Sequence, residues 1–322
     1  MAAAPASEWV AIAPSDLLVM DLAPDAKGKA RRVVIQLMPA PFSQGWIGNI
    51  RKLAAAHWWD ETSVNRVQDN YVAQWGDASE KKPLPAGLAT VPESGYETSL
   101  LQISEAGFTE FRPWPSVDRP SPGSPASNAA SIDEVASVVE GRMEKWFDAA
   151  QKLRLGDSYA PTVGFSGGFP VAFEAKAADN PTGWPLHCYG MVGVGRNMSP
   201  DTGSGAELYA VIGHAPRHLD RNIAVVGRVV SGIEYLSSLP RGTEELGFYN
   251  TEVERTPIGS IRIASDLPAA EQPRFEYLST ESSSFARYAD ARANRRDPFF
   301  ITPAGGADIC NIPVPVRAVA AK

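Results

Sequence analysis

The sequence predicts a mainly-β fold with a large, partly helical insertion, and two observations support this. Short runs rich in Val, Ile and aromatic residues, bounded by turn residues, occur before residue 78 and after residue 182. Between those positions the strand pattern gives way to Pro- and Ser-rich sequence and one amphipathic stretch. With 322 residues and 44% hydrophobic content, the chain can supply a sizeable core.

The chain is predicted to begin with a β-hairpin followed by a helix. Residues 9–23 and 31–39 are predicted strands, and residues 25–28 (Asp-Ala-Lys-Gly) have the composition of a turn. Ser43 is a suitable N-cap for the helix that follows. Apolar side chains then recur every three or four positions, which predicts one buried helix face: Trp46, Ile50, Leu53 and Ala54.

Residues 62–77 are predicted to form a second strand pair, which contains a single basic residue, Arg66. Asp69 and Asn70 supply the turn, and side chains on the second strand alternate between two faces. A guanidinium is always charged and has five N–H donors, so it is costly to leave unpaired away from water. Arg66 is therefore expected to serve a carboxylate, a carbonyl or a substrate.

Residues 78–182 form the predicted insertion. Residues 112–131 are rich in Pro and Ser and are predicted to be an extended surface loop. Ser131 and Glu134 match a capping box, which opens a helix that Gly156 would end. This helix is expected to pack outside the main domain, and a lid over a substrate site is the alternative.

After the insertion, strands and helices alternate. Strands are predicted at 190–195, 223–230 and 258–264, with a helix at 230–239. Residues 275–295 are predicted to contain a helix. Residues 312–316 are predicted to be an edge strand or a docked tail, because Pro cannot donate to a central ladder.

Two blocks of residues in this order resemble the signature of the cyclophilin family of peptidyl-prolyl isomerases. The first block matches an Arg followed by an aromatic-hydrophobic-x-Gln-Gly-Gly-Asp run, at Arg66, Tyr71, Gln74, Gly76 and Asp77. The second block lies in residues 203–213, 218–222 and 225–232. The similarity is to the large bacterial form of the family, with an insertion and a C-terminal extension.

The resemblance implies a closed, eight-stranded antiparallel barrel capped by two helices. It places an isomerase domain at residues 8–265, interrupted by the insertion at 78–182, and a C-terminal extension at 266–322 packed on that domain. It also implies cis/trans isomerisation of X-Pro bonds in proteins, which assists folding and needs no cofactor and no metal. The expected partners are proline-containing polypeptides.

The resemblance also implies the site residues. Arg66 would be the catalytic guanidinium, and Gln74 would orient it or the substrate backbone. Six residues would bind substrate: Tyr71, Val72, Glu207, Tyr209, His218 and Leu219.

Three positions depart from the family pattern. Asn65 stands where the signature has His, Glu207 where it usually has Gln, and Gly193 where an Asn binds the substrate backbone. A carboxylate at 207 would be able to pair with Arg66 and compete with substrate, which predicts low activity. The alternative hypothesis is a non-catalytic proline-peptide binding module or chaperone, in which Arg66 is only a structural ion-pair partner.

Other patterns carry less weight. Residues 164–168 have the Gly-x-Ser-x-Gly form of a hydrolase nucleophile elbow, but residues 169–173 are predicted to be a strand where the elbow needs a helix. His214 and His218 have the spacing of helical zinc ligands, yet Pro216 lies between them. Residues 190–195 are glycine-rich without the helix that phosphate binding needs.

Charge and cysteine content limit the expected binding partners and cellular location. The net charge of -7 disfavours nucleic-acid binding, no apolar run predicts membrane insertion, and a monomer is expected. A periplasmic location is predicted from the resemblance, with no signal peptide visible in the sequence, and the cytoplasm is the alternative. Cys188 and Cys310 are either two separate thiols or a disulfide, which would require an oxidising compartment.

Overall fold

The computed structural model describes residues 4–105, 112–113, 157–175, 181–302 and 306–319. Its contacts divide the chain into two compact units. The barrel unit comprises Ala11–Glu97, Leu186–Tyr277 and Val316–Lys322, and the insertion unit comprises Met1–Val10, Thr98–Pro185 and Leu278–Pro315. The domain boundaries expected at 78, 182 and 265 stay predictions, as does the packing of the C-terminal extension.

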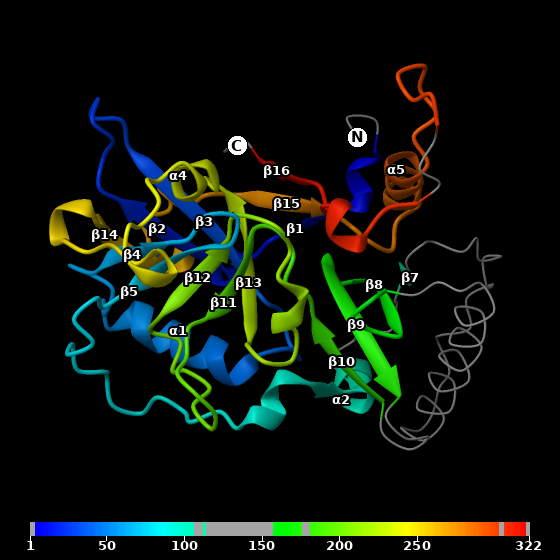
Figure 1. Ribbon diagram of the computed structural model, residues 1–322. Coiled ribbons are helices and arrows are strands. Elements are labelled where there is room, and N and C mark those ends of the chain that lie inside the picture. Colours follow the sequence, from blue (N-terminus) through cyan, green and yellow to red (C-terminus); the bar gives the residue numbers. More distant parts are fainter. Residues whose placement is uncertain (1–3, 106–111, 114–156, 176–180, 303–305, 320–322) are drawn as a thin grey trace. The chain divides into compact units, whose positions relative to one another are not determined.

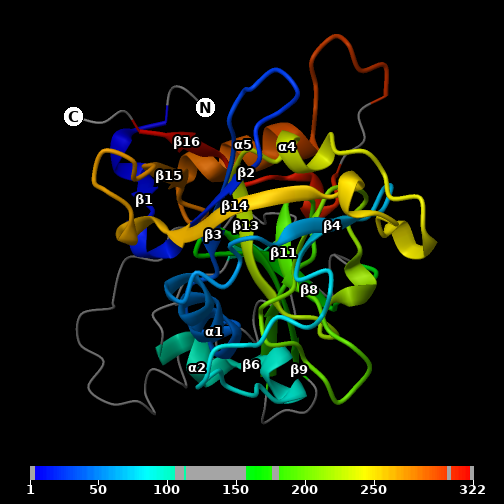
Figure 2. The same cartoon turned by 90° about the vertical axis from the view of Figure 1, so that its left-hand side faces the viewer.

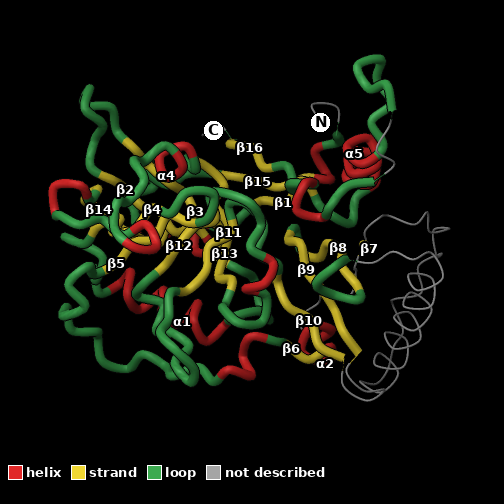
Figure 3. Tube along the Cα trace, viewed as in Figure 1, coloured by secondary structure: helices red, strands yellow, loops and turns green. Residues whose placement is uncertain are grey.

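The barrel unit contains the predicted closed barrel of eight antiparallel strands (Figures 1 and 3). Around the barrel the strands follow the order β11-β12-β5-β4-β14-β2-β3-β13, and β13 pairs with β11 to close it. The fold class is therefore confirmed. The strands are β2 (Leu17–Leu22), β3 (Arg31–Leu37), β4 (Ser63–Val67), β5 (Val72–Gly76), β11 (Met191–Val194), β12 (Leu208–Val211), β13 (Val225–Ser231) and β14 (Thr256–Ile263).

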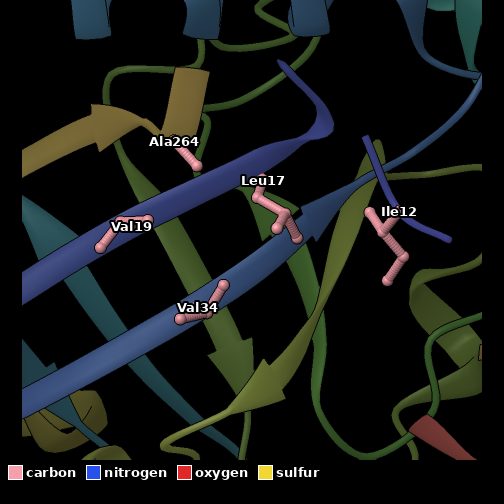
Figure 4. Packing of buried hydrophobic residues seen from close by; sticks show 5 residues of the cluster. All are labelled: Ile12, Leu17, Val19, Val34 and Ala264. Carbon is pink, nitrogen blue, oxygen red and sulfur yellow. The ribbon is translucent and has the colours of Figure 1, made fainter. Parts of the chain in front are cut away.

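Strands β2 and β3 form the predicted hairpin, in register from the Leu17–Gln36 pair to the Leu22–Arg31 pair. Apolar side chains from this hairpin and from the segments beside it make one hydrophobic cluster, shown in Figure 4: Ile12, Leu17, Val19, Val34 and Ala264. All of these residues are buried. Burial of this kind, worth about 25 cal/mol per Å² of apolar surface, fixes which face of each strand points inward.

Helix α1 (Gln44–Ala55) follows the hairpin as predicted and buries its apolar face, including Trp46, Ile50 and Leu53. The capping role predicted for Ser43 is wrong. Ser43 adopts a left-handed conformation, makes no side-chain cap, and donates its hydroxyl to the Val225 carbonyl at 2.7 Å. The Ser43 hydroxyl thus bonds to a distant strand instead of to the first turn of α1.

Helix α4 (Glu234–Ser237) is shorter than the predicted 230–239, because β13 extends to Ser231 and Gly232 turns the chain with φ +83°. In two views at right angles, α1 lies below the barrel strands and α4 above them (Figures 1 and 2). The two helices thus lie at opposite ends of the barrel.

The insertion unit contains a five-stranded sheet in the order β6-β10-β9-β8-β7. Its strands are β6 (Thr98–Ser99), β7 (Arg112–Pro113), β8 (Thr162–Ser166), β9 (Phe169–Ala175) and β10 (Pro181–Pro185), and its helices include α2 (Leu100–Glu105) and α5 (Ser283–Ala293). Phe165 of β8 packs edge-on against Phe285 of α5, with ring centroids 5.0 Å apart. Since β8 leads through Gly167 and Gly168 into the antiparallel strand β9, residues 164–168 are a hairpin and no nucleophile elbow.

A small third sheet has the order β1-β15-β16, from β1 (Trp9–Ala11), β15 (Phe275–Leu278) and β16 (Val316–Ala318). The segment 275–295 thus begins as a strand, and its helix starts only at Ser283. Most of 312–316 is irregular and leads into β16.

The remaining regular elements are short 3-10 helices. Eight are described: η1 (Ala6–Glu8), η2 (Pro14–Asp16), η3 (Glu93–Tyr96), η4 (Arg217–Leu219), η5 (Glu245–Gly247), η6 (Glu252–Glu254), η7 (Ala264–Asp266) and η8 (Ile309–Asn311). The predicted loop beyond residue 113 and the helix predicted to open at Ser131 lie outside the described residues. Within the described ranges, no helix has the length and apolarity needed to cross a bilayer.

Candidate active site

Arg66 lies on β4, at a point where the register with β5 shifts between Val64 and Arg66, so that Arg66 pairs with Gln74. Its guanidinium donates to three neutral oxygens. Nη1 donates to Gln74 Oε1 at 3.1 Å, Nε donates to the Leu246 carbonyl at 2.8 Å, and Nη2 donates to Gln68 Oε1. A guanidinium has five N–H donors, so two remain available for a further acceptor.

No carboxylate among the described residues neutralises Arg66. Burial lowers the pKa of its guanidinium, while the nearby Tyr71 and Tyr209 hydroxyls act in the opposite direction. An arginine stays protonated at any ordinary pH. The site therefore presents a half-buried positive charge whose own contacts leave it uncompensated.

Two aromatic rings flank this charge. The Arg66 guanidinium carbon lies 5.7 Å from the centroid of the Tyr71 ring and 5.2 Å from that of Phe248. Both distances are within the range of a cation–π interaction. The rings favour the charged form and limit how far the guanidinium can swing.

Phe248 belongs to residues 242–249, which we call the strap. The strap runs along β4: the Gly242 amide donates to the Val67 carbonyl, Phe248 forms an isolated bridge with Arg66, and the Tyr249 amide donates to the Asn65 carbonyl. At the centre of the strap Leu246 adopts φ 59°, which directs its carbonyl to Arg66 Nε. The strap fixes the arginine from the side opposite to Gln74.

Glu207 does not pair with Arg66. Its carboxyl group accepts hydrogen bonds from the Asn65 side chain, the Asp77 backbone and the Gln74 side-chain amide. Because the Gln74 nitrogen faces Glu207, the Gln74 oxygen is left to face Arg66. Glu207 thus positions Gln74, and the competition with substrate expected for this carboxylate finds no support in the structure.

The predicted proline-contacting residues form one hydrophobic cluster beside Arg66, which we call the Tyr209 cluster. Its buried members are Val72, Tyr209 and Val211, and Tyr71, Leu219 and Ile223 pack against them. In the β5–β12 ladder Val72 lies opposite Val211, and Tyr209 lies opposite Gln74. The ladder therefore joins the cluster directly to the residue that holds Arg66.

His218 and Gly193 differ from the rest. The His218 side chain is exposed on η4, next to Leu219, and it takes no part in the Tyr209 cluster. Gly193 pairs with Tyr209 across β11 and β12, and a Cβ placed there would lie 2.3 Å from the Tyr209 hydroxyl oxygen. The Tyr209 ring occupies the space that a side chain at 193 would need.

Two groups of site residues were missed by the sequence analysis. The first is the strap, whose Leu246 and Phe248 lie far from Arg66 in sequence and have no local signal. The second is a buried set under the Tyr209 cluster, formed by His187, Arg217 and Asp220. The only available hints were the residue types themselves and the position of His187 between Leu186 and Cys188.

A closed barrel with an arginine-centred site beside an apolar cluster defines a cyclophilin-like protein. In agreement, the family model described as cyclophilin type peptidyl-prolyl cis-trans isomerase/CLD matches residues 31–265. This chain belongs to that family and is an isomerase of X-Pro peptide bonds.

A solved structure with a similar fold is the crystal structure of cyclophilin AquaCyp293 from Hirschia baltica. The alignment covers 98% of this chain and 94% of that one, with a TM-score of 0.64 and 18% identity. At that identity the likeness shows the fold alone. No curated protein sequence matches this chain.

We expect Glu207→Gln to raise the free energy of unfolding at pH 8 and to change it little at pH 4. Burial raises the pKa of the Glu207 carboxyl group above its usual 4.5. Between the unfolded-state pKa and this higher folded-state pKa, the folded state keeps a proton that the unfolded chain has lost. The free energy of unfolding therefore falls as pH rises through that interval. Asn65 Oδ1 is buried without a partner among the described residues, and after an amide flip it would accept from the new glutamine.

The measurement is urea denaturation of both proteins from pH 4 to pH 8. Glu61→Gln replaces an exposed carboxylate and serves as the control. A Glu207→Gln protein that is less stable than wild type at pH 8 would show that the carboxylate is net favourable there.

Proposed function

We propose that Arg66 is the group that accelerates isomerisation. Rotation about a peptide bond breaks amide resonance, which costs about 18–20 kcal/mol and makes uncatalysed X-Pro isomerisation take about 10–100 s. A ten-thousandfold acceleration requires lowering that barrier by about 5–6 kcal/mol. No covalent step is needed.

The chemistry follows from what changes as the bond twists. The prolyl nitrogen lone pair leaves conjugation and becomes a hydrogen-bond acceptor, whereas in the planar imide it is not one. A guanidinium N–H aimed at this nitrogen stabilises the twisted state more than either planar state, which is the differential binding that catalysis requires. Arg66 has two N–H donors outside its three intramolecular bonds, which supports this role.

The surroundings of Arg66 support the same role. Gln74, Gln68 and the strap hold the guanidinium in place before substrate arrives, so little reorganisation is needed during the reaction. The Tyr209 cluster would contact the apolar face of the proline ring through the partly buried Tyr71 and Leu219, with Val72 and Tyr209 packed beneath them. His218 and Glu207 would then contribute less to substrate contact than the sequence suggested.

The single observation that carries this proposal is the absence of an ion-pair partner for Arg66 among the described residues. A structural arginine, as in the binding-module hypothesis, would be expected to have its charge matched by a carboxylate. Here Glu207 is bonded elsewhere, and the holders of Arg66 are all neutral.

We also propose that the substrates are proline-containing segments of polypeptides, that the protein assists their folding as a monomer, and that it works in the periplasm without binding nucleic acid. Both Cys188 and Cys310 are disulfide-bonded, which supports an oxidising compartment over the cytoplasm. The net charge of -7 is in keeping with no nucleic-acid partner.

Arg66→Ala should lower kcat/KM for a short Ala-Pro peptide by about a hundredfold or more, because removing one preorganised donor typically costs about 10²–10³. A protease-coupled isomerisation assay measures this. Arg51→Ala removes an arginine from α1 and is the control. Wild-type turnover at the spontaneous rate, or full activity in Arg66→Ala, would contradict the proposed role.

Phe248→Ala should lower kcat by about 2- to 30-fold with a smaller change in KM, since a cation–π contact is worth about 0.5–2 kcal/mol and acts here on the guanidinium. The same assay separates the two constants. Phe299→Ala, which removes a ring that is 83% exposed, is the matched control. An unchanged kcat would show that Gln74, Gln68 and the Leu246 carbonyl hold Arg66 without the ring.

Protein isolated from its own host without reductant should contain no free thiol, since both cysteines are bonded. Thiol titration in denaturant, with a reduced sample as the control, gives the count. Two free thiols per chain would favour the cytoplasm.

A further inference from the structure

Four polar side chains form a continuous hydrogen-bonded chain beneath the Tyr209 cluster. The Tyr209 hydroxyl lies 3.0 Å from His187 Nε2, and His187 Nδ1 lies 2.9 Å from Asp220 Oδ1. Asp220 Oδ1 also accepts from the His187 backbone amide at 2.9 Å, and Arg217 Nε donates to Asp220 Oδ2 at 2.6 Å. All four residues are at most 7% exposed.

The protons in this chain can be assigned from the chemistry of its ends. Asp220 accepts from a guanidinium and from a backbone amide, so it is an ionised acceptor. The His187 ring then donates from Nδ1 to Asp220, and in the neutral ring Nε2 is the acceptor. The Tyr209 hydroxyl is consequently the donor to His187, and burial raises the pKa of Tyr209, which keeps the phenol neutral.

The hydrogen bond to His187 holds the Tyr209 ring at its hydroxyl end, and the backbone of β12 holds it at Cβ. The His187 and Tyr209 rings are nearly parallel, with centroids 6.4 Å apart and planes 15° from each other. The ring lies across Gly193, where a Cβ would come within 2.4 Å of its Cζ atom. A short backbone approach, a stacked imidazole and a directed hydrogen bond together leave the ring one orientation.

We propose that His187, Asp220 and Arg217 are positioning residues that hold the Tyr209 ring as the base of the proline-contacting surface, with its hydroxyl proton turned away from substrate. The inference rests on the proposed function of the Arg66 site. A hydroxyl that already donates to His187 has no proton to offer a substrate carbonyl, so the surface acts as an apolar one. The hydrogen bonds among these residues thus contribute to binding of the proline ring, whereas Arg66 acts on the prolyl nitrogen.

That separation can be measured. The holders of Arg66 are Gln74, Gln68 and Leu246, and none of them belongs to the His187 chain. A variant that loosens the Tyr209 ring should raise KM, because the proline ring is held less well in ground and transition states alike, and should leave kcat nearly unchanged. A variant that merely folds less should lower the apparent kcat at an unchanged KM.

The first experiment is steady-state kinetics of Tyr209→Phe and Asp220→Asn with an Ala-Pro peptide. We expect KM to rise about five- to tenfold, the size of one lost hydrogen bond, with kcat within about twofold of wild type. His57→Asn, which replaces an exposed histidine that has φ 55°, is the control. A lower apparent kcat at unchanged KM in both variants would overturn the proposal.

The second experiment detects the proton assignment without turnover. Long-range ¹H–¹⁵N spectra should show His187 as the Nδ1-protonated tautomer, and Tyr209→Phe should move the Nε2 resonance. A proton on Nε2, or a doubly protonated ring, would overturn the proposal.

If wild-type protein shows no turnover, the proposed function fails. The His187 chain is then tested by peptide affinity, which should still fall in Tyr209→Phe. Unchanged affinity in that variant would overturn the inference.

Discussion

The site depends on a single interaction: a guanidinium held by neutral oxygens. Arg66 is bound by two side-chain amides and one backbone carbonyl. Neutral acceptors direct the N–H groups without cancelling the charge, so the field of the guanidinium remains for a bound substrate. In the proposed mechanism, a carboxylate in their place would satisfy the arginine and weaken its attraction for a developing lone pair. The neutrality of the three acceptors therefore keeps the positive charge of Arg66 uncancelled.

The barrel supplies each acceptor from a different direction. Gln74 comes from the neighbouring strand β5, Gln68 from the turn that leaves β4, and the Leu246 carbonyl from the strap. Glu207 contributes at one remove, since its carboxyl group determines which end of the Gln74 amide faces Arg66. This explains how an acidic residue can stand close to the site while the guanidinium stays uncompensated.

The elements that the sequence predicted are those defined by local patterns. The hairpin of β2 and β3, helix α1 and the β4–β5 pair each follow from turn residues and apolar spacing within a short window. Strand β15 was missed because its four residues acquire their meaning only from β16, which lies far along the chain. Ser43 was misjudged for a related reason: the acceptor of its hydroxyl, Val225, comes from a distant strand.

The same limit applies to the site. Arg66, Gln74 and the members of the Tyr209 cluster were accessible because the family motif places them, and the geometry brings them together. The Leu246 carbonyl is a backbone group 180 residues from Arg66, and a backbone acceptor leaves no mark in a side-chain pattern. His187 and Asp220 were visible as residue types, but their pairing depends on closure of the barrel, since β11 and β12 lie between them in the chain.

The close approach of Tyr209 to Gly193 has a consequence for reading other sequences. A chain with a larger residue at this position can still place an aromatic ring on the facing strand, but the ring must tilt, and a phenol there would lose its imidazole partner. A glycine at the position of Gly193, together with the tyrosine, the histidine and the aspartate, therefore identifies homologues that contain the same buried hydrogen-bonded network.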